Sequence, residues 1–195
     1  TDLLARKDAH HLAVIGAGAQ GRSHLAAMME VRDIQKVTVY DQRREAAKKY
    51  QKEMEEKYKI PVMVCDSVEE AVKGAEIICT VTPSKEPYLK AEWITPGAHI
   101  NAVGAFTPNT REIESSLMAK AKLYADQVEA MKKECGEYLI PKNEGLFGEE
   151  HITGSIGGIL AGQVPGREND TEITLFDALG LAVEDVACGR FLCRE

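Results

Sequence analysis

The sequence predicts an α/β fold in which a doubly wound, mostly parallel sheet carries helices on both faces. Short apolar runs alternate with segments of helical spacing along the chain of 195 residues. Runs that are apolar throughout are typical of parallel strands, because helices cover both faces of such a sheet. With a hydrophobic content of 44%, the chain can bury a sizeable core. We therefore expect one domain over residues 1–195.

Seven apolar runs are predicted as buried strands. In order, they cover residues 12–15, 37–40, 62–64, 76–82, 99–104, 122–126 and 172–176. The stretch 143–170 is less regular and carries many glycines. A helix over about residues 178–191 is expected to follow the last strand.

Helices are expected between these strands. The first continues from the glycine-rich stretch after the first strand as RSHLAAMMEV, residues 22–31. The clearest covers 44–59, with polar residues on one face and, on the other, Ala46, Ala47, Tyr50, Met54 and Tyr58. Ser67 and Glu70 form a capping-box pattern for a further helix, and Gly74 supplies its stop.

Composition excludes several classes of function. A net charge of −7 and a pI near 5.4 argue against nucleic acid as a partner. No apolar run approaches the roughly 20 residues of a membrane span, and TDLLARKDAHH at the start lacks the order of a secretion signal. A soluble, cytoplasmic protein is expected. The five cysteines contain no C-x-x-C pair, so we expect reduced thiols and no metal site: Cys65, Cys79, Cys135, Cys188 and Cys193.

A glycine pattern follows the first strand, where GAGAQG places Gly16, Gly18 and Gly21 as G-x-G-x-x-G. In such a pattern the first glycine permits a tight turn, the second lets the backbone approach a pyrophosphate, and the third allows close helix packing. Free N–H groups at the helix start then face the phosphates. The alternative is a tight turn without a ligand, but the strand, the helix and a downstream acid together favour a dinucleotide site.

The downstream acid is Asp41, which follows Gly21 by 20 residues at the end of the second strand. A carboxylate there can accept hydrogen bonds from the adenosine ribose. A 2′-phosphate would meet repulsion of about 4 kcal/mol at about 4 Å and an effective dielectric of about 20. This favours NAD as the cofactor. Arg43 and Arg44 could offset part of the repulsion by pairing with a phosphate, so NADP stays as the alternative.

The loops after the fourth and fifth strands should border the nicotinamide half of the cofactor, because ligands lie beyond the carboxyl ends of the strands. Thr80 and Thr82 in TVTPS, and Gly104 and Phe106 in VGAFTP, are the candidates. No Ser-His-Asp or Cys-His pairing is apparent, so the catalytic residues stay unassigned. Three histidines are interpreted as helix or strand surface: His24, His99 and His151.

Five blocks of sequence together resemble the ornithine cyclodeaminase and mu-crystallin family. They are GAGAQGRSHL, TVTPSKEPYL, PGAHINAVGAFTPNTREI, PGREND and EITLFDALGLAVEDVA, and the resemblance extends over residues 1–193. It implies a Rossmann domain that binds NAD or NADP. It also implies kinship with alanine dehydrogenases, cyclodeaminases and ketimine reductases, which share hydride transfer at an amino-acid carbon.

The resemblance implies positions for the cofactor. The phosphates would lie on Gly18, Ala19 and Gln20 and the nicotinamide near the ends of the fourth and fifth strands, while residues 177–180 would close over it. The full set of expected cofactor-binding residues is Gly16, Gly18, Ala19, Gln20, Gly21, Asp41, Gln42, Arg43, Thr80, Val81, Thr82, Val103, Gly104, Phe106, Leu179 and Gly180.

Two departures from the family pattern matter. Cyclodeaminases carry a catalytic Asp in VGAD, where this chain has Phe106, and a phenyl ring cannot move protons. Phe106 is expected to wall the nicotinamide pocket and exclude water. Family members are also longer, with an N-terminal part that binds the substrate and forms a homodimer, and that part is missing from residues 1–195.

The expected function is therefore that of the NAD-binding domain of an amino-acid or imino-acid oxidoreductase. Its substrate would be a small amino or imino acid, and this chain alone is expected to be inactive. Two alternatives stay open: a non-catalytic nucleotide-binding protein like mu-crystallin, and a true ornithine cyclodeaminase, a lyase, against which Phe106 counts.

Overall fold

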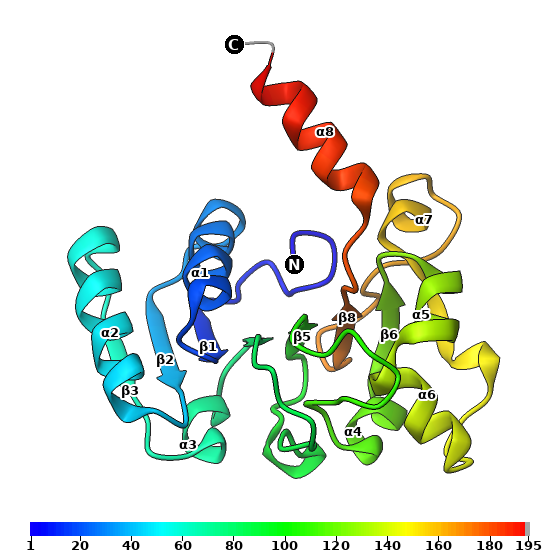
Figure 1. The fold of residues 1–195 in the computed structure, drawn as a ribbon, viewed down its shortest axis with the longest axis horizontal. Coiled ribbons are helices and arrows are strands. Elements are labelled where there is room, and N and C mark those ends of the chain that lie inside the picture. Colours follow the sequence, from blue (N-terminus) through cyan, green and yellow to red (C-terminus); the bar gives the residue numbers. More distant parts are fainter. Residues whose placement is uncertain (194–195) are drawn as a thin grey trace.

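The computed structural model describes residues 1–193, which form one sheet of eight strands with every neighbouring pair parallel. The strands lie in the order β3-β2-β1-β4-β5-β8-β6-β7 (Figure 1). Their bounds are β1 His11–Ile15, β2 Lys36–Tyr40, β3 Val62–Val64, β4 Ile77–Thr80, β5 His99–Ala102, β6 Lys122–Ala125, β7 Ile152–Ser155 and β8 Thr174–Asp177. The predicted doubly wound α/β fold is confirmed.

Helices connect the strands. The α-helices of the described residues are α1 Ala19–Val31, α2 Arg44–Tyr58, α3 Val68–Val72, α4 Ser115–Lys120, α5 Val128–Glu134, α6 Gly136–Asn143, α7 Ile156–Leu160 and α8 Ala182–Leu192. Two 3-10 turns lie at Ala91–Trp93 and Glu149–His151. None of the helices in residues 1–193 is long and apolar enough to cross a membrane.

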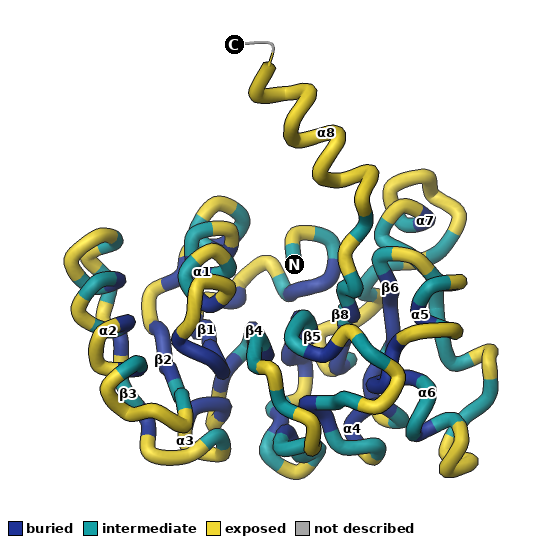
Figure 2. The backbone as a smooth tube through the Cα atoms, viewed as in Figure 1, coloured by how far each residue is buried: buried dark blue, intermediate teal, exposed yellow. Residues whose placement is uncertain are grey.

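The sheet is buried on both faces, which is why its strands are apolar throughout. Along β1, Leu12 and Val14 belong to one core cluster, with Leu25 of α1 and Tyr50 of α2. Alternate residues of the same strand belong to the other cluster, which includes residues of α3, α4 and α6. Figure 2 shows the buried sheet between partly exposed helices.

The predicted helical patterns are confirmed in detail. In α2, Ala47, Tyr50 and Met54 are buried. Ser67 caps α3 by accepting a hydrogen bond from the amide of Glu70 at 3.0 Å. The Glu70 carboxylate reaches back to the amide of Asp66 at 2.7 Å, one residue before the expected partner.

Differences from the predicted strands concentrate at their ends and at β7. The fourth and fifth runs stop at Thr80 and Ala102, so the residues beyond them form loops. Strand β7, Ile152–Ser155, was not predicted. It is an edge strand whose four residues are all only half-buried, so its sequence ITGS lacks the apolar character of the other strands.

The prediction for His99 as a surface residue is wrong. His99 has no exposed surface, and its ring contacts the hydroxyl of Thr174 at 2.9 Å and the amide oxygen of Asn101 at 3.2 Å. Polar partners on the same and the neighbouring strand therefore allow a histidine inside the sheet layer. Burial lowers the pKa of His99 well below its ordinary value.

The last helix begins later than predicted. Residues 178–181 follow β8 as an irregular segment in which Gly180 has a φ of +88° and donates its amide to Asp126 at 2.8 Å. Helix α8 then extends away from the sheet (Figure 1), and none of its residues is buried. Its exposed apolar side chains are Val183, Val186, Phe191 and Leu192.

Candidate functional site

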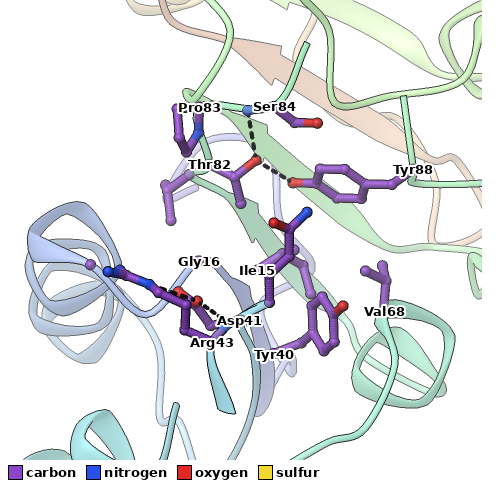
Figure 3. Close-up of a pocket in the computed structure, with 13 residues that line it drawn as sticks. Ile15, Gly16, Tyr40, Asp41, Arg43, Val68, Thr82, Pro83, Ser84 and Tyr88 are labelled. Carbon is purple, nitrogen blue, oxygen red and sulfur yellow. Dashed lines mark hydrogen bonds and ion pairs between the residues drawn. The ribbon is translucent and has the colours of Figure 1, made fainter. Parts of the chain in front are cut away.

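A cavity of about 530 Å³ lies at the carboxyl ends of β1, β2 and β4. The chain crosses from one side of β1 to the other at this place, and such a crevice is where doubly wound sheets bind ligands. In Figure 3 the lining side chains converge from the loops after these strands and from α3. The lining residues are Ile15, Gly16, Gly18, Tyr40, Asp41, Gln42, Arg43, Val68, Val81, Thr82, Pro83, Ser84 and Tyr88.

The three glycines of the loop after β1 have different surroundings. Gly16 has a φ of +113°, and a Cβ on it would lie 2.8 Å from the carbonyl oxygen of Val81. A Cβ on Gly21 would lie 2.3 Å from the carbonyl oxygen of Gly16. Apart from Gly18 itself and its immediate neighbours along the chain, no protein atom of the described residues lies within 4 Å of a Cβ on Gly18. Backbone packing thus requires Gly16 and Gly21, whereas the space beside Gly18 is open.

Arg22 on α1 fixes the carbonyl groups of this loop. Its guanidinium donates to the carbonyl oxygens of Ala17 at 2.5 Å and Gly18 at 2.9 Å, and it pairs with Glu53 of α2 at 2.6 Å. The amides of residues 18–20 have no acceptor within the described part of the chain. They lie at the start of α1, so they are available to an anionic group.

Asp41 lies beside the glycine loop and lines the cavity. One carboxylate oxygen accepts from the amide of Ala17 and the other from the amide of Arg43, each at 2.9 Å. The Arg43 guanidinium is 3.7 Å from the carboxylate and 81% exposed, while Arg44 pairs with Asp66. Two backbone amides therefore fix the orientation of the carboxylate at the edge of the cavity.

The opposite wall of the cavity comes from the loop after β4 (Figure 3). Thr82 and Tyr88 lie there, and their hydroxyl groups both donate to Glu112 at 2.6 Å. Glu112 has no exposed surface and lies behind this wall.

Only part of the predicted set of cofactor-binding residues lines the cavity. Seven predicted residues line it: Gly16, Gly18, Asp41, Gln42, Arg43, Val81 and Thr82. The remaining nine lie outside the lining: Ala19, Gln20, Gly21, Thr80, Val103, Gly104, Phe106, Leu179 and Gly180.

Several of these nine have other surroundings. Thr80 has no exposed surface, and its hydroxyl has no partner among the described residues. Phe106 is 66% exposed on the loop after β5. Leu179 packs against the core, and Asp177 at the start of that segment is fully buried. Of the segment 177–180, the first residue therefore faces the protein interior.

Six lining residues were not predicted: Ile15, Tyr40, Val68, Pro83, Ser84 and Tyr88. Ile15 and Tyr40 are the last residues of β1 and β2, and Pro83 and Ser84 follow Thr82, so the rule on strand ends could have found them. Val68 and Tyr88 come from other segments, and nothing in their spacing indicates that they reach the cavity.

A group of buried acids lies outside the cavity. Asp177 accepts from the thiol of Cys135 at 3.3 Å, and its other oxygen has no partner within residues 1–193. Burial raises the pKa of Asp177 to about 8. Burial, and then the nearby Asp177, raise the pKa of Glu137 well above its ordinary value. Within the same described range, no group of three or more His, Cys, Asp or Glu residues could hold a metal ion.

The fold and the glycine loop define the Rossmann class of α/β proteins. The chain belongs to the ornithine cyclodeaminase/mu-crystallin family, whose family model matches residues 1–194.

Comparisons with individual proteins agree with this membership. The chain is 39% identical over 193 residues to a Delta(1)-pyrroline-2-carboxylate reductase of Bacillus cereus, covering 98% of this chain and 59% of that protein. Its structure is similar to that of the same enzyme from Thermococcus litoralis in complex with NADH and L-proline. That match has a TM-score of 0.95 and 42% identity, and it covers 97% of this chain and 59% of the other.

An archaeal alanine dehydrogenase dimer with bound NAD is also similar. The TM-score is 0.91 at 40% identity, with 97% of this chain and 58% of that chain covered. The chain therefore spans less than two thirds of the length of these relatives.

Proposed function

We propose that this chain is the NAD(H)-binding domain of an oxidoreductase that transfers hydride at the amino or imine carbon of a small amino or imino acid. One observation carries the proposal. Gly18 and the fixed carboxylate of Asp41 line the same cavity, and the free amides of residues 18–20 begin at that glycine, at the start of α1. The relatives, a pyrroline-carboxylate reductase and an alanine dehydrogenase with NADH or NAD in their structures, support the reaction type.

The residues of the cavity fit a dinucleotide. The open space beside Gly18 suits a pyrophosphate, which would accept from the amides of residues 18–20. Asp41 would accept from the adenosine ribose, and the wall with Thr82 would border the nicotinamide. The cofactor supplies the hydride, while the residues of the cavity would bind and orient the cofactor.

Cofactor preference is the first testable consequence. We expect NADH to bind about tenfold or more tightly than NADPH, because a 2′-phosphate would approach the fixed Asp41 carboxylate. Asp41→Ala should reduce this difference in affinity, because it weakens NADH binding and removes the repulsion of the 2′-phosphate of NADPH. Calorimetric titration with each cofactor measures the two affinities, and the exposed Asp33→Asn is the matched control. Equal affinities in the parent chain would mean that Arg43 governs the site.

The substrate side of the site is a separate part of the proposal. We propose that the region of the relatives which this chain does not cover supplies substrate binding and a homodimer contact, in a cytoplasmic enzyme. Phe106 is exposed on the loop after β5 and would be covered once that region and the substrate are in place. No catalytic acid or base is assigned.

A second prediction concerns turnover. The 195-residue chain should bind NADH yet show no turnover with alanine, ornithine, proline or pyrroline-2-carboxylate. Positioning of reacting groups supplies about 7 to 11 kcal/mol of barrier reduction, and an open nicotinamide face loses most of it. Absorbance of NADH measures this directly. A turnover rate of about 1 per second or more would contradict the proposal that substrate binding is supplied by a region outside this chain.

The same assay on a longer protein with the full length of the relatives separates the alternatives. Oxidation of an amino acid or reduction of a cyclic imine supports the oxidoreductase. NADH binding without turnover would favour a non-catalytic nucleotide-binding protein. Formation of proline from ornithine without net change in NADH would favour a cyclodeaminase, which Phe106 argues against because its side chain cannot carry a proton.

A further inference from the structure

Glu112 is a buried carboxylate that joins two loops at the carboxyl edge of the sheet. One of its oxygens, Oε1, accepts from the amide of Thr82 at 2.7 Å, from the hydroxyl of Thr82 at 2.6 Å and from the phenol of Tyr88 at 2.6 Å. The other, Oε2, accepts from the amide of Gly104 at 3.0 Å. A single side chain thus connects the loop after β4, the loop after β5 and Tyr88.

The partners of Glu112 are four groups that each carry a proton to donate. Two are backbone amides and two are hydroxyls, and they contact both oxygens of the carboxyl group. The hydroxyl oxygens of Thr82 and Tyr88 each lie 2.6 Å from Oε1, and they lie 3.2 Å from each other. Glu112 therefore sets the orientation of both side chains.

The backbone of Glu112 is held equally firmly. Its amide donates to the carboxylate of Glu137 at 2.6 Å. Its carbonyl oxygen accepts from the amides of Tyr88 at 2.8 Å and Leu89 at 3.0 Å. The backbone of Glu112 is therefore hydrogen-bonded to the segment that carries Tyr88, as its side chain is to the Tyr88 hydroxyl.

These contacts affect only one side of the cavity. Thr82 and Tyr88 line the wall opposite Asp41, and the glycine loop lies between the two sides (Figure 3). We propose that Glu112 is a positioning residue, which fixes Thr82 and Tyr88 as the wall against which the nicotinamide half of the cofactor lies. This inference rests on the proposed dinucleotide site. If the wall borders the nicotinamide half alone, binding of the adenosine half will not depend on Glu112.

The substitution Glu112→Gln tests the proposal with little change in side-chain volume. A glutamine places an NH2 group where an acceptor is needed, so it faces at least one donor, either Gly104 or the Thr82 and Tyr88 hydroxyls. We expect the affinity for NADH to fall about tenfold or more. The affinity for ADP-ribose, which has the phosphates and adenosine but no nicotinamide, should stay within about twofold. The fluorescence of bound NADH should also change, because the environment of the ring changes.

The controls separate a local effect from loss of the fold. Glu86→Gln makes the same chemical change on an exposed residue of the same loop and should alter neither affinity. If Glu112→Gln does not fold, Tyr88→Phe removes one of the donors and keeps the ring, and it should weaken NADH more than ADP-ribose.

The outcomes distinguish this inference from the proposed function. A parent chain that binds neither NADH nor ADP-ribose would overturn both. A parent that binds both ligands, with a Glu112→Gln variant that loses both equally or loses neither, would overturn the role of Glu112 alone. A selective loss of NADH affinity supports it.

Discussion

Gly18→Val is expected to lower the affinity for NADH about 100-fold or more, or about 2.7 kcal/mol, without lowering the melting temperature. The backbone at Gly18 has a φ of −82°, which valine adopts readily, and no described protein atom lies within 4 Å of a Cβ there. The added side chain would instead occupy the space in which the pyrophosphate approaches the amides of α1. Fluorescence titration and a thermal melt measure the two quantities.

Gly21→Ala is the matched comparison within the same loop. Its Cβ would lie 2.3 Å from the carbonyl oxygen of Gly16, so the helix must move away from β1. We expect a loss of about 1–3 kcal/mol in the free energy of unfolding, as for other overpacked sites. If Gly18→Val kept its affinity with an unchanged circular dichroism spectrum, the loop would be only a turn.

The second large effect is expected from Asp177→Asn, measured as the pH dependence of stability. Burial raises the pKa of Asp177 to about 8 in the folded protein, well above the ordinary aspartate value of 3.8. A raised pKa means that the native state keeps this proton up to a higher pH than the unfolded state does. The contribution of the protonated Asp177 carboxyl to the free energy of unfolding is fully present below about pH 4 and is lost as the pH rises through about 8.

Asparagine cannot ionise, so the variant should lack this dependence. Between about pH 6 and pH 8 we expect the stability of the parent to fall relative to the variant by about 2 kcal/mol, since one proton is worth about 1.4 kcal/mol per pH unit. Urea denaturation at several pH values measures the difference, with the exposed Asp170→Asn as control. Parallel pH profiles for parent and Asp177→Asn would show that Asp177 is ionised in the native state.

The fold could be predicted because its signals are local. Apolar runs report burial on both faces of a parallel sheet. The spacing of the apolar face predicted a helix over residues 44–59, and α2 covers Arg44–Tyr58. The side of the cavity that Gly16 and Asp41 line was predictable for the same reason. Gly16 and Asp41 each stand at the end of a strand, and a parallel sheet brings neighbouring strand ends together.

The other side of the cavity depends on contacts between distant segments. Glu112 is separated by 30 residues from Thr82, which it orients, and a glutamate in a loop usually indicates an exposed residue. Thr80 was predicted as a site residue because it ends β4, but strand alternation turns its side chain into the core. The position of a residue in the sequence predicts that it lies at the end of a strand. Which side chains at that end face the cavity depends on the packing of distant segments.

The place of β8 has a consequence for synthesis on the ribosome. Strand β8 pairs with β5 on one side and β6 on the other, although it follows both in the sequence. A nascent chain can pair β1 to β5, and separately β6 with β7, before residues 174–177 have left the exit tunnel. During that interval the edges of β5 and β6 are both unpaired, and open edges of this kind recruit other chains. Arrival of the last strand joins the two halves of the sheet and removes both edges at once.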